Sequence, residues 1–363
     1  MTRFRFALAL LVMVLAAGVG RAKVPESASN RNPYPAGKGP VKVFILAGQS
    51  NMEGQGSLRN LEYLVYNEKT AAQYEHLKDK DGRWVERQDV WVWTTNGERA
   101  GNLKPGFGVS ESKVGPELAF GWVVGEAMDN QVLLIKTCWG GKSVRRDFLS
   151  PRSAMPADDL LQKELERRRQ KEPNATLDDV KATYGLYYRK TIEHVKDVLG
   201  RLKELFPGYK EDTGYELAGL VWFQGWNDMV DGDQRGQKYV HYTERLANFV
   251  RDVRQEFKTP NLPVVIGELG AGGPEKRGDF QAAQKAVAEI PEFKGTVVFV
   301  ETAQFWDPDV EKMVNENVWK GPDWTRFYNV GSDRGYHYLG SGRIYYQMGK
   351  AFGEAMMGRL APK

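Results

Sequence analysis

A serine, a histidine and an aspartate occupy positions from which they could cleave an ester. Ser50 follows the apolar run 43–47 and Gly48, so it should lie just beyond a buried strand, where open α/β sheets bind ligands. His337 lies in a loop directly before the helix predicted over 341–357, and Asp333 precedes it by four residues. A serine becomes a useful nucleophile when a histidine accepts its proton and an acid orients that histidine. These residue types predict nucleophilic ester cleavage, with a helix-capping serine as the simpler alternative.

Two further segments offer donors for the negative charge that develops on an attacked carbonyl oxygen. Gly140 and Gly141 follow the strand predicted over 131–137, and residues without side chains let a substrate approach backbone N–H groups closely. Gln224 and Asn227 follow the strand predicted over 216–224, and either side-chain amide can donate without changing charge. Together with the N–H of Ser50 they predict an oxyanion hole. Ordinary polar turns at both places are the alternative.

Five other side chains are candidates for binding the substrate. Gln49 and Asn51 flank the serine. Trp226 could stack on a sugar ring or an acyl methyl group, or fill the core. Arg145 and Arg146 follow the glycine pair and could bind a sugar carboxylate or hydroxyl group, although a solvated charged turn explains them equally well.

Four sequence blocks resemble those of one enzyme family. Residues 48–52, GQSNM, are similar to the nucleophile block of the sialate O-acetylesterase-like branch of the SGNH hydrolases, which includes carbohydrate esterase family six. The glycine loop at 140–141, the block QGWND at 224–228 and the terminal His337 follow in that family's order. The resemblance implies an exported serine esterase that removes O-acetyl groups from a polysaccharide, an oligosaccharide or sialic acid through an acetyl-enzyme. It also implies that Ser50, His337 and Asp333 are catalytic, and that no cofactor is needed.

The chain departs from the family pattern in two places. Trp226 stands where a glutamate is usual, and Asp333 lies one residue further from His337 than the usual Asp-x-x-His spacing. Glu301, Asp307 or a backbone carbonyl could therefore orient His337 instead. A lipase or thioesterase of the same superfamily, and a carbohydrate-binding relative without activity, are the alternative functions.

Short apolar runs alternate with amphipathic helical patterns along most of the chain, which predicts a mostly parallel sheet flanked by helices. The fold implied by the resemblance is a three-layer α/β/α, flavodoxin-like SGNH hydrolase domain over residues 41–360, with five or six strands. A charge-rich helical insertion is expected at about 156–212.

The first 22 residues are expected to be a secretory signal peptide. Arg3 and Arg5 precede an apolar run over 6–15 that is too short to span a bilayer, and Gly20 and Ala22 suit cleavage. Removal of this segment leaves 48 Lys and Arg against 47 Asp and Glu, so nothing indicates a nucleic-acid partner. We expect export to the periplasm or medium, a flexible lead-in over 23–40, and no stable membrane insertion after cleavage.

The remaining cysteine and histidine residues do not indicate a metal or a disulfide. Cys138 is the single cysteine, so the chain cannot form an internal disulfide bond. His76, His194 and His241 form no spacing typical of zinc ligands. We expect no metal, and we expect His194 to lie on the exposed side or the edge of its helix.

Overall fold

A seven-stranded sheet forms the centre of the protein. The computed structural model describes residues 38–360, except 96–98, 207–208, 232–238 and 277. The predicted signal peptide and nearly all of the lead-in lie outside these residues. The strands of the sheet are β1 (Val41–Gly48), β3 (Arg87–Trp93), β4 (Ala100–Leu103), β6 (Val132–Cys138), β7 (Tyr215–Phe223), β8 (Val264–Gly267) and β9 (Val297–Val300). A separate two-stranded sheet pairs β2 (Gly56–Ser57) with β5 (Lys113–Val114).

The strand order in the main sheet is β4-β3-β6-β1-β7-β8-β9. All neighbours are parallel except β4, which runs antiparallel to β3 at one edge. The mostly parallel sheet is thus confirmed, but the expected strand number was too low. The strand at the edge, β4, has the sequence AGNL and pairs with β3 alone.

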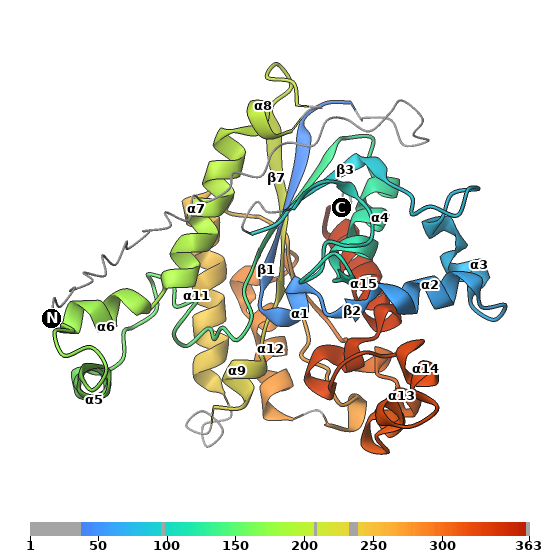
Figure 1. Ribbon diagram of the computed structural model, residues 1–363. Helices are drawn as coiled ribbons and strands as arrows, with labels where there is room; N and C mark the ends of the chain where they lie inside the picture. Colours follow the sequence, from blue (N-terminus) through green and yellow to red (C-terminus); the bar gives the residue numbers. More distant parts are fainter. Residues whose placement is uncertain (1–37, 96–98, 207–208, 232–238, 277, 361–363) are drawn as a thin grey trace, which may run out of the picture.

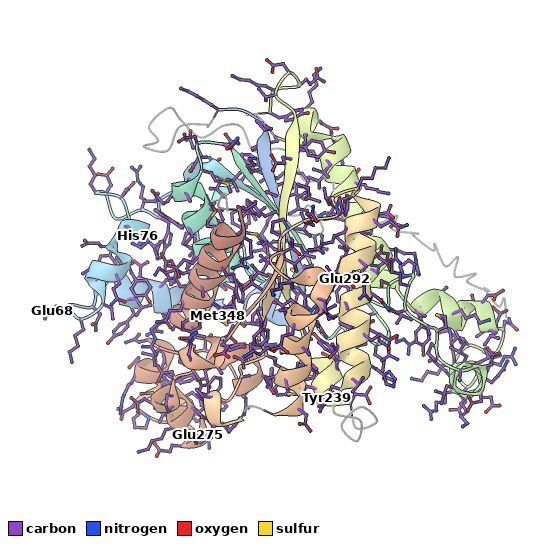
Figure 2. The ribbon with its side chains drawn as sticks, turned by 180° about the vertical axis from the view of Figure 1, so that it is seen from behind. Glu68, His76, Tyr239, Glu275, Glu292 and Met348 are labelled. Carbon is purple, nitrogen blue, oxygen red and sulfur yellow. The ribbon has the colours of Figure 1, made fainter. Side chains whose placement is uncertain are left out.

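Helices cover both faces of the sheet, so the three-layer architecture is confirmed. One face carries α7 (Leu186–Gly200), α11 (Val240–Glu256) and α12 (Asp279–Glu289), and the other carries α2 (Leu58–Tyr66), α4 (Glu117–Ala127) and α15 (Gly342–Leu360) (Figure 1). Met348 on α15 and Glu292 beside α11 mark the two helical layers in the view from behind (Figure 2). The side chains of β1 alternate between the layers: Val43 and Ile45 pack with α7 and α11, whereas Phe44 and Leu46 pack with α4 and α15.

The segment expected to be an insertion divides into two parts. The helices α5 (Asp158–Arg169) and α6 (Leu177–Thr183) project from the body and share a small cluster of their own around Leu161, Leu165 and Val180. The helix α7, by contrast, buries Val195 and Val198 in the main core. Only the first half of 156–212 is therefore peripheral to the sheet.

The remaining helices are short. They are α1 (Ser50–Glu53), α3 (Ala71–Tyr74), α8 (Leu202–Leu205), α9 (Trp226–Met229), α13 (Pro308–Asn315) and α14 (Trp324–Tyr328), together with 3-10 turns that include Ala303–Phe305 and Gly335–Gly340. In the described part of the chain, no helix is both long and apolar enough to cross a bilayer.

The tight packing of Gly48 between β6 and β7 determines where the nucleophile lies. Strand β1 is the central strand, and its last residue, Gly48, pairs with Cys138 on one side and Phe223 on the other. A Cβ atom on Gly48 would lie 2.1 Å from the carbonyl oxygen of Phe223, so only glycine fits this turn. The chain leaves the sheet there and places Ser50 between the carboxyl ends of β6 and β7.

Candidate active site

Ser50 is the first residue of α1 and is half-buried. Its Oγ lies 3.1 Å from Nε2 of His337, which is hydrogen-bonding distance. The two residues are 287 positions apart in the chain. The first N–H groups of a helix have no partner within that helix, so the N–H of Ser50 can serve an external acceptor. The fold therefore brings together the predicted nucleophile and the predicted base.

Asp333 contacts the other nitrogen of the same imidazole. Its Oδ2 lies 2.8 Å from Nδ1 of His337. The spacing of four residues between Asp333 and His337 is accommodated by a tight loop. In this loop Leu339 has φ +61° and donates its N–H to the carbonyl of Arg334. The loop therefore folds back over the extra residue, and Asp333 still reaches the ring.

The surroundings keep the Asp333 carboxylate charged. Burial alone would raise its pKa, but the hydrogen bonds from His337 and the N–H of Arg334, with the charges of His337 and Lys113, lower the pKa below its ordinary value. Lys113 is held beside it by hydrogen bonds to the Gln55 carbonyl and the Ser332 hydroxyl.

The other acids considered for this position have different partners. Asp307 caps α13 through the N–H groups of Asp309 and Val310, and its other oxygen pairs with Arg343. Oε1 of Glu301 lies 3.7 Å from Nζ of Lys285. Asp333 is thus the acid that contacts His337, and Glu301 and Asp307 are not.

The two residues flanking Ser50 are buried and hold the site together, which corrects their assignment as substrate contacts. Gln49 is 3% exposed; it donates to Oδ1 of Asn227 at 3.2 Å and accepts the N–H of Gly225 at 3.1 Å. Asn51 is 1% exposed and donates to the carbonyl oxygen of Tyr336 at 3.1 Å. Each amide therefore fixes another part of the site and is not positioned to contact a ligand.

The two candidate amides of the block QGWND, Gln224 and Asn227, differ in whether they can still donate. Gln224 is buried, and both hydrogens of its Nε2 are used, on the Lys142 carbonyl at 2.9 Å and on Asp228 at 2.6 Å. It has no N–H left for an oxyanion, so this assignment was wrong. Asn227 is half-buried, and because Gln49 binds its oxygen, its nitrogen points the opposite way. Among the described residues, Asn227 is the amide of this block that can still donate.

The two glycines after β6 have different surroundings. A Cβ atom on Gly140 would lie 3.9 Å from Cβ of Ser50 and 3.2 Å from Oε2 of Glu53. Gly141 has φ +70°, a left-handed conformation that favours glycine, and is exposed. Gly140 is thus the glycine next to the nucleophile, although its N–H is hydrogen-bonded to the carboxylate of Glu53.

Glu53 is a site residue that the sequence interpretation missed. Burial raises the pKa of its carboxyl group, and the Gly140 N–H and the charges of Lys136 and His337 oppose this effect only in part. Its distance from Ser50 in the sequence could have indicated this role. Residues three positions apart on a helix share a face, and Glu53 lies three residues after Ser50.

Asp228 is a second missed residue. Its buried carboxylate accepts the N–H groups of Val144 at 2.8 Å and Arg145 at 3.0 Å, in addition to Nε2 of Gln224. Burial raises its pKa, and these hydrogen bonds oppose that shift. Asp228 therefore ties the loop containing Gly140 and Gly141 to the helix containing Asn227.

The two arginines form ion pairs within the protein. Arg146 pairs with Glu164 of α5 and donates to Thr183 at 2.8 Å, so its guanidinium points toward the projecting helices rather than forming a substrate lip. Arg145 pairs with Asp231 at 2.7 Å. The structure thus assigns Arg146 to the support of α5 and α6.

Aromatic rings line the side of the site that carries His337. The ring of Tyr336 lies 4.5 Å from that of His337 and 5.6 Å from that of Trp226, measured between centroids. Trp226 is half-buried against the main core, whereas Tyr336 is 41% exposed.

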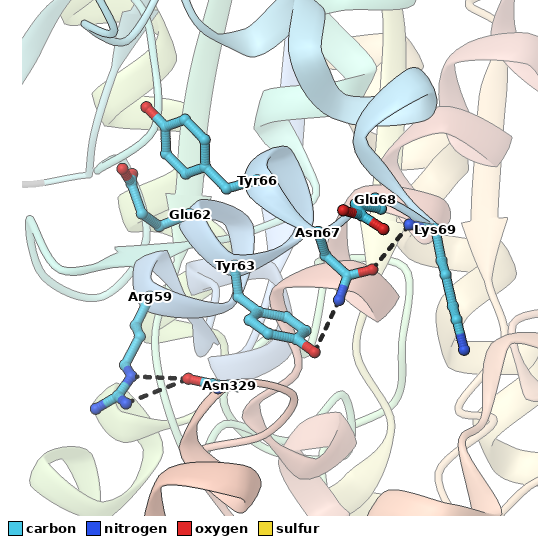
Figure 3. Close-up of a pocket in the computed structure, with 8 residues that line it drawn as sticks. All are labelled: Arg59, Glu62, Tyr63, Tyr66, Asn67, Glu68, Lys69 and Asn329. Carbon is cyan, nitrogen blue, oxygen red and sulfur yellow. Dashed lines mark hydrogen bonds between the residues drawn. The ribbon is translucent and has the colours of Figure 1, made fainter.

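A cavity of about 200 Å³ lies on the opposite side, toward β3 and β6. Glu53, Thr95, Arg99, Lys136 and Trp139 are among the residues that line it. A larger depression of about 540 Å³ lies on α2 and is lined by Arg59, Tyr63, Tyr66 and Asn329 with four further residues (Figure 3). None of the candidate catalytic residues lines the depression on α2, so the candidate active site lies at Ser50 and not in that depression.

The buried Cys138 is not an activated thiol. Burial raises the pKa of Cys138 to about 12, which leaves a thiol instead of a reactive thiolate at neutral pH. No group of three or more His, Cys, Asp or Glu side chains among the described residues could hold a metal ion.

Comparison with known proteins identifies a matching family. The family model described as "Carbohydrate esterase, sialic acid-specific acetylesterase" matches residues 40–305, which include Ser50, Gly140 and Asn227 but not Asp333 or His337. No curated protein sequence matches.

Solved structures show distant likenesses. They include a protein from Arabidopsis thaliana (16% identity, 88% of this chain and 98% of that one, TM-score 0.47) and NanS (15%, 89% and 98%, 0.48). A carbohydrate acetylesterase from Xanthomonas citri is 13% identical over 86% of this chain and 55% of that one, with a TM-score of 0.45. We base the family assignment on the family model alone.

Proposed function

The chain belongs to the carbohydrate esterase family of sialic acid-specific acetylesterases, and from this membership we propose that Ser50, His337 and Asp333 remove O-acetyl groups from a sugar through an acetyl-enzyme. The protein is a carboxylic ester hydrolase acting on acetylated sugars. One observation carries the proposed mechanism: Ser50 Oγ lies 3.1 Å from His337 Nε2, and Nδ1 of the same ring lies 2.8 Å from Asp333.

In the first half of the reaction, Ser50 Oγ attacks the acetyl carbonyl carbon while Nε2 of His337 takes the hydroxyl proton. Asp333 holds the ring with Nε2 toward the serine and stabilises the imidazolium that forms. The tetrahedral intermediate then expels the sugar oxygen, which takes the proton from His337. The acetyl group remains on Ser50.

The developing oxyanion is stabilised by donors on both sides of Ser50. We assign these donors as the N–H of Ser50, Nδ2 of Asn227 and an N–H of the glycine loop. The hydrogen bond from Gln49 fixes the orientation of the Asn227 amide. This supports its assignment as an oxyanion donor, because preorganised donors need no rearrangement during the reaction. In the glycine loop, Gly140 adjoins Ser50 and would have to exchange its hydrogen bond to Glu53 for one to the oxyanion, whereas Gly141 is the alternative donor.

In the second half, water attacks the acetyl carbonyl and gives its proton to His337. Collapse of this intermediate releases acetic acid and returns the proton to Ser50. The sum is acetylated sugar and water giving sugar and acetic acid, so no co-reactant is required. The half-buried carboxyl group of Glu53 beside the nucleophile favours a short acyl group over a long apolar chain.

The test is acetate release from p-nitrophenyl acetate and from acetylated xylan, with the butyrate and octanoate esters for comparison. We expect acetate to be preferred and activity to fall by about 10³-fold or more in Ser50→Ala. Persistence of activity in that variant would exclude Ser50 as the nucleophile. A preference for octanoate would favour a lipase of the same superfamily.

Export is a further part of the proposal. Residues 1–22 have the charge, apolar run and small residues of a signal peptide. Expression of the full chain in a bacterium, followed by N-terminal sequencing of the periplasmic or secreted product, should give a start near Lys23. A product that stays in the cell with Met1 or Thr2 at its start would contradict export.

A further inference from the structure

We propose that the aromatic pair formed by Tyr336 and Trp226 binds the ring of the sugar that leaves in the reaction, which makes Tyr336 a specificity-determining residue. This inference rests on the proposed function, because it begins from His337 as the proton donor to the leaving group. It adds the side of the site on which the carbohydrate lies and the residues that recognise it.

The direction of proton transfer determines where the sugar lies. The oxygen that leaves must approach Nε2 of His337 within about 3 Å to take its proton. The sugar carbon is bonded directly to that oxygen, so the sugar ring must lie beside the His337 imidazole. The methyl group of the acetyl ester lies on the other side of the carbonyl carbon. The leaving sugar therefore lies next to whatever surface flanks His337.

That surface is aromatic and open. The Tyr336 ring lies 4.5 Å from the His337 ring at an angle of 73°, and Trp226 continues the surface 5.6 Å further on. Tyr336 is 41% exposed, so its ring is available to a ligand. Pyranose rings have apolar C–H faces, and flat aromatic side chains bind such faces at low cost in side-chain entropy.

The backbone of this surface is held rigidly. Asn51, next to the nucleophile, donates to the Tyr336 carbonyl oxygen at 3.1 Å, and its own oxygen accepts from Tyr345 at 2.6 Å. Gly225, which precedes Trp226, donates to Gln49 on the other side of Ser50. Both flanking residues of the nucleophile thus position the two rings relative to Ser50. A preformed surface of this kind favours binding because little conformational entropy of the protein is lost when the ligand binds.

The choice of Trp226 also sets the charge of the subsite. Trp226 presents an uncharged, flat indole ring beside Tyr336. We therefore expect recognition here through ring stacking, with neutral pyranosides as the favoured leaving groups.

The experiment measures one ratio, kcat/KM for a mono-acetylated methyl glucopyranoside divided by kcat/KM for methyl acetate, which has no ring. Tyr336→Ala should lower this ratio about tenfold and Trp226→Ala about threefold or more. Tyr336→Phe, which keeps the ring, should stay within about twofold of wild type. Tyr66→Ala is the matched control, since Tyr66 is an exposed tyrosine on α2 and lines the separate hollow of Figure 3.

Two results would overturn the inference. One is an unchanged ratio in both alanine variants. The other is an equal loss on both esters, which would mean that Tyr336 only supports His337. If an alanine variant unfolds, the leucine variant keeps apolar packing without a flat ring and should lower the ratio likewise. Failure of the proposed function itself is separate, because it would appear as activity that persists in Ser50→Ala.

Discussion

The carboxylate of Asp228 accepts the backbone N–H of Val144 at 2.8 Å, and so joins the glycine loop after β6 to the helix after β7. The same carboxylate accepts the N–H of Arg145 and the amide of Gln224. Donors of the proposed oxyanion hole come from both joined segments. The relative position of Gly140 and Asn227 therefore depends on a buried acid that contacts neither the serine nor the histidine.

Replacement of this acid should loosen the site. In Asp228→Asn the new amide group must face at least one of these N–H donors, so a hydrogen bond is lost in a buried place. We expect a loss of about 1–3 kcal/mol in the free energy of unfolding and a fall of about 10- to 100-fold in kcat. Denaturant titration and steady-state kinetics measure both. Asp159→Asn, on the projecting α5 and 67% exposed at its side chain, is the control and should change neither.

The acid of the triad gives a second prediction. Asp333→Asn keeps the shape of the side chain but removes the charge that stabilises the imidazolium. We expect kcat to fall by about 10²- to 10⁴-fold with a smaller change in KM. Asp307→Asn, which removes the charge paired with Arg343, should retain most of the activity. The reverse ranking of the two variants would assign the orienting role to Asp307.

The two amides of the block QGWND should give opposite results. Asn227→Ala removes a donor to the oxyanion, so kcat should fall by about 10²- to 10³-fold while the free energy of unfolding changes little. Gln224→Ala removes the amide that donates to the Lys142 carbonyl and to the Asp228 carboxylate in the core. It should therefore cost about 2–4 kcal/mol of stability. Thermal unfolding and kcat, measured on the same preparations, distinguish these roles, and equal stability losses would contradict them.

A histidine with a buried ring nitrogen, His194, predicts that the stability of the protein depends on pH. Burial lowers the pKa of His194 from 6.5 to about 4, with Asp197 opposing weakly, and its Nε2 is buried without a hydrogen-bond partner. The side chain is half-buried, which agrees with the expected place at the edge of its helix, although its Nε2 is turned inward. Below pH 6.5 the unfolded chain binds a proton that the folded protein rejects, so acid favours unfolding through this residue.

The size of this effect can be measured by comparing wild type with a variant that lacks His194. Between pH 7.5 and 5.0, wild type should lose about 2 kcal/mol more of its free energy of unfolding than His194→Gln, which cannot titrate. Urea unfolding at the two pH values gives these numbers. His241→Gln is the control, because His241 is half exposed at its side chain and lies 3.8 Å from Glu244. Parallel pH curves for wild type and His194→Gln would contradict the prediction.

The sequence predicted the parts of the fold that depend on continuous burial. Strands β1, β6 and β7 are apolar runs buried on both faces, and such runs are recognisable without tertiary information. Strand β4, AGNL, has two residues of low strand propensity and is ordered by pairing with β3 at the sheet edge. Helix α2 carries the buried apolar stripe Leu61, Leu64 and Val65, but at 9 residues it is too short for helical periodicity to stand out in the sequence.

The site was predictable where residue type alone indicates chemistry. Ser50 and His337 could be selected because one directly follows a buried strand within the block GQSNM and the other lies in the loop before the last helix. The amides could not be sorted in the same way. Gln49, Asn51 and Gln224 are polar and adjacent to the site in sequence, yet each is turned into the core to bind another part of it. Which way an amide points is decided by neighbours distant in sequence, such as Tyr345 and Asp228.

The separation of Ser50 and His337 by 287 residues has a consequence for how activity arises during synthesis. The serine leaves the ribosome early, but its base arrives only with the last loop, immediately before α15 packs against α4. A nascent chain, or one truncated before residue 333, therefore carries an unactivated serine and should be inert toward esters. Contacts of such long range form slowly. The return of esterase activity after dilution from denaturant should thus lag behind the return of helical circular dichroism, and it reports the moment at which the two ends of the fold meet.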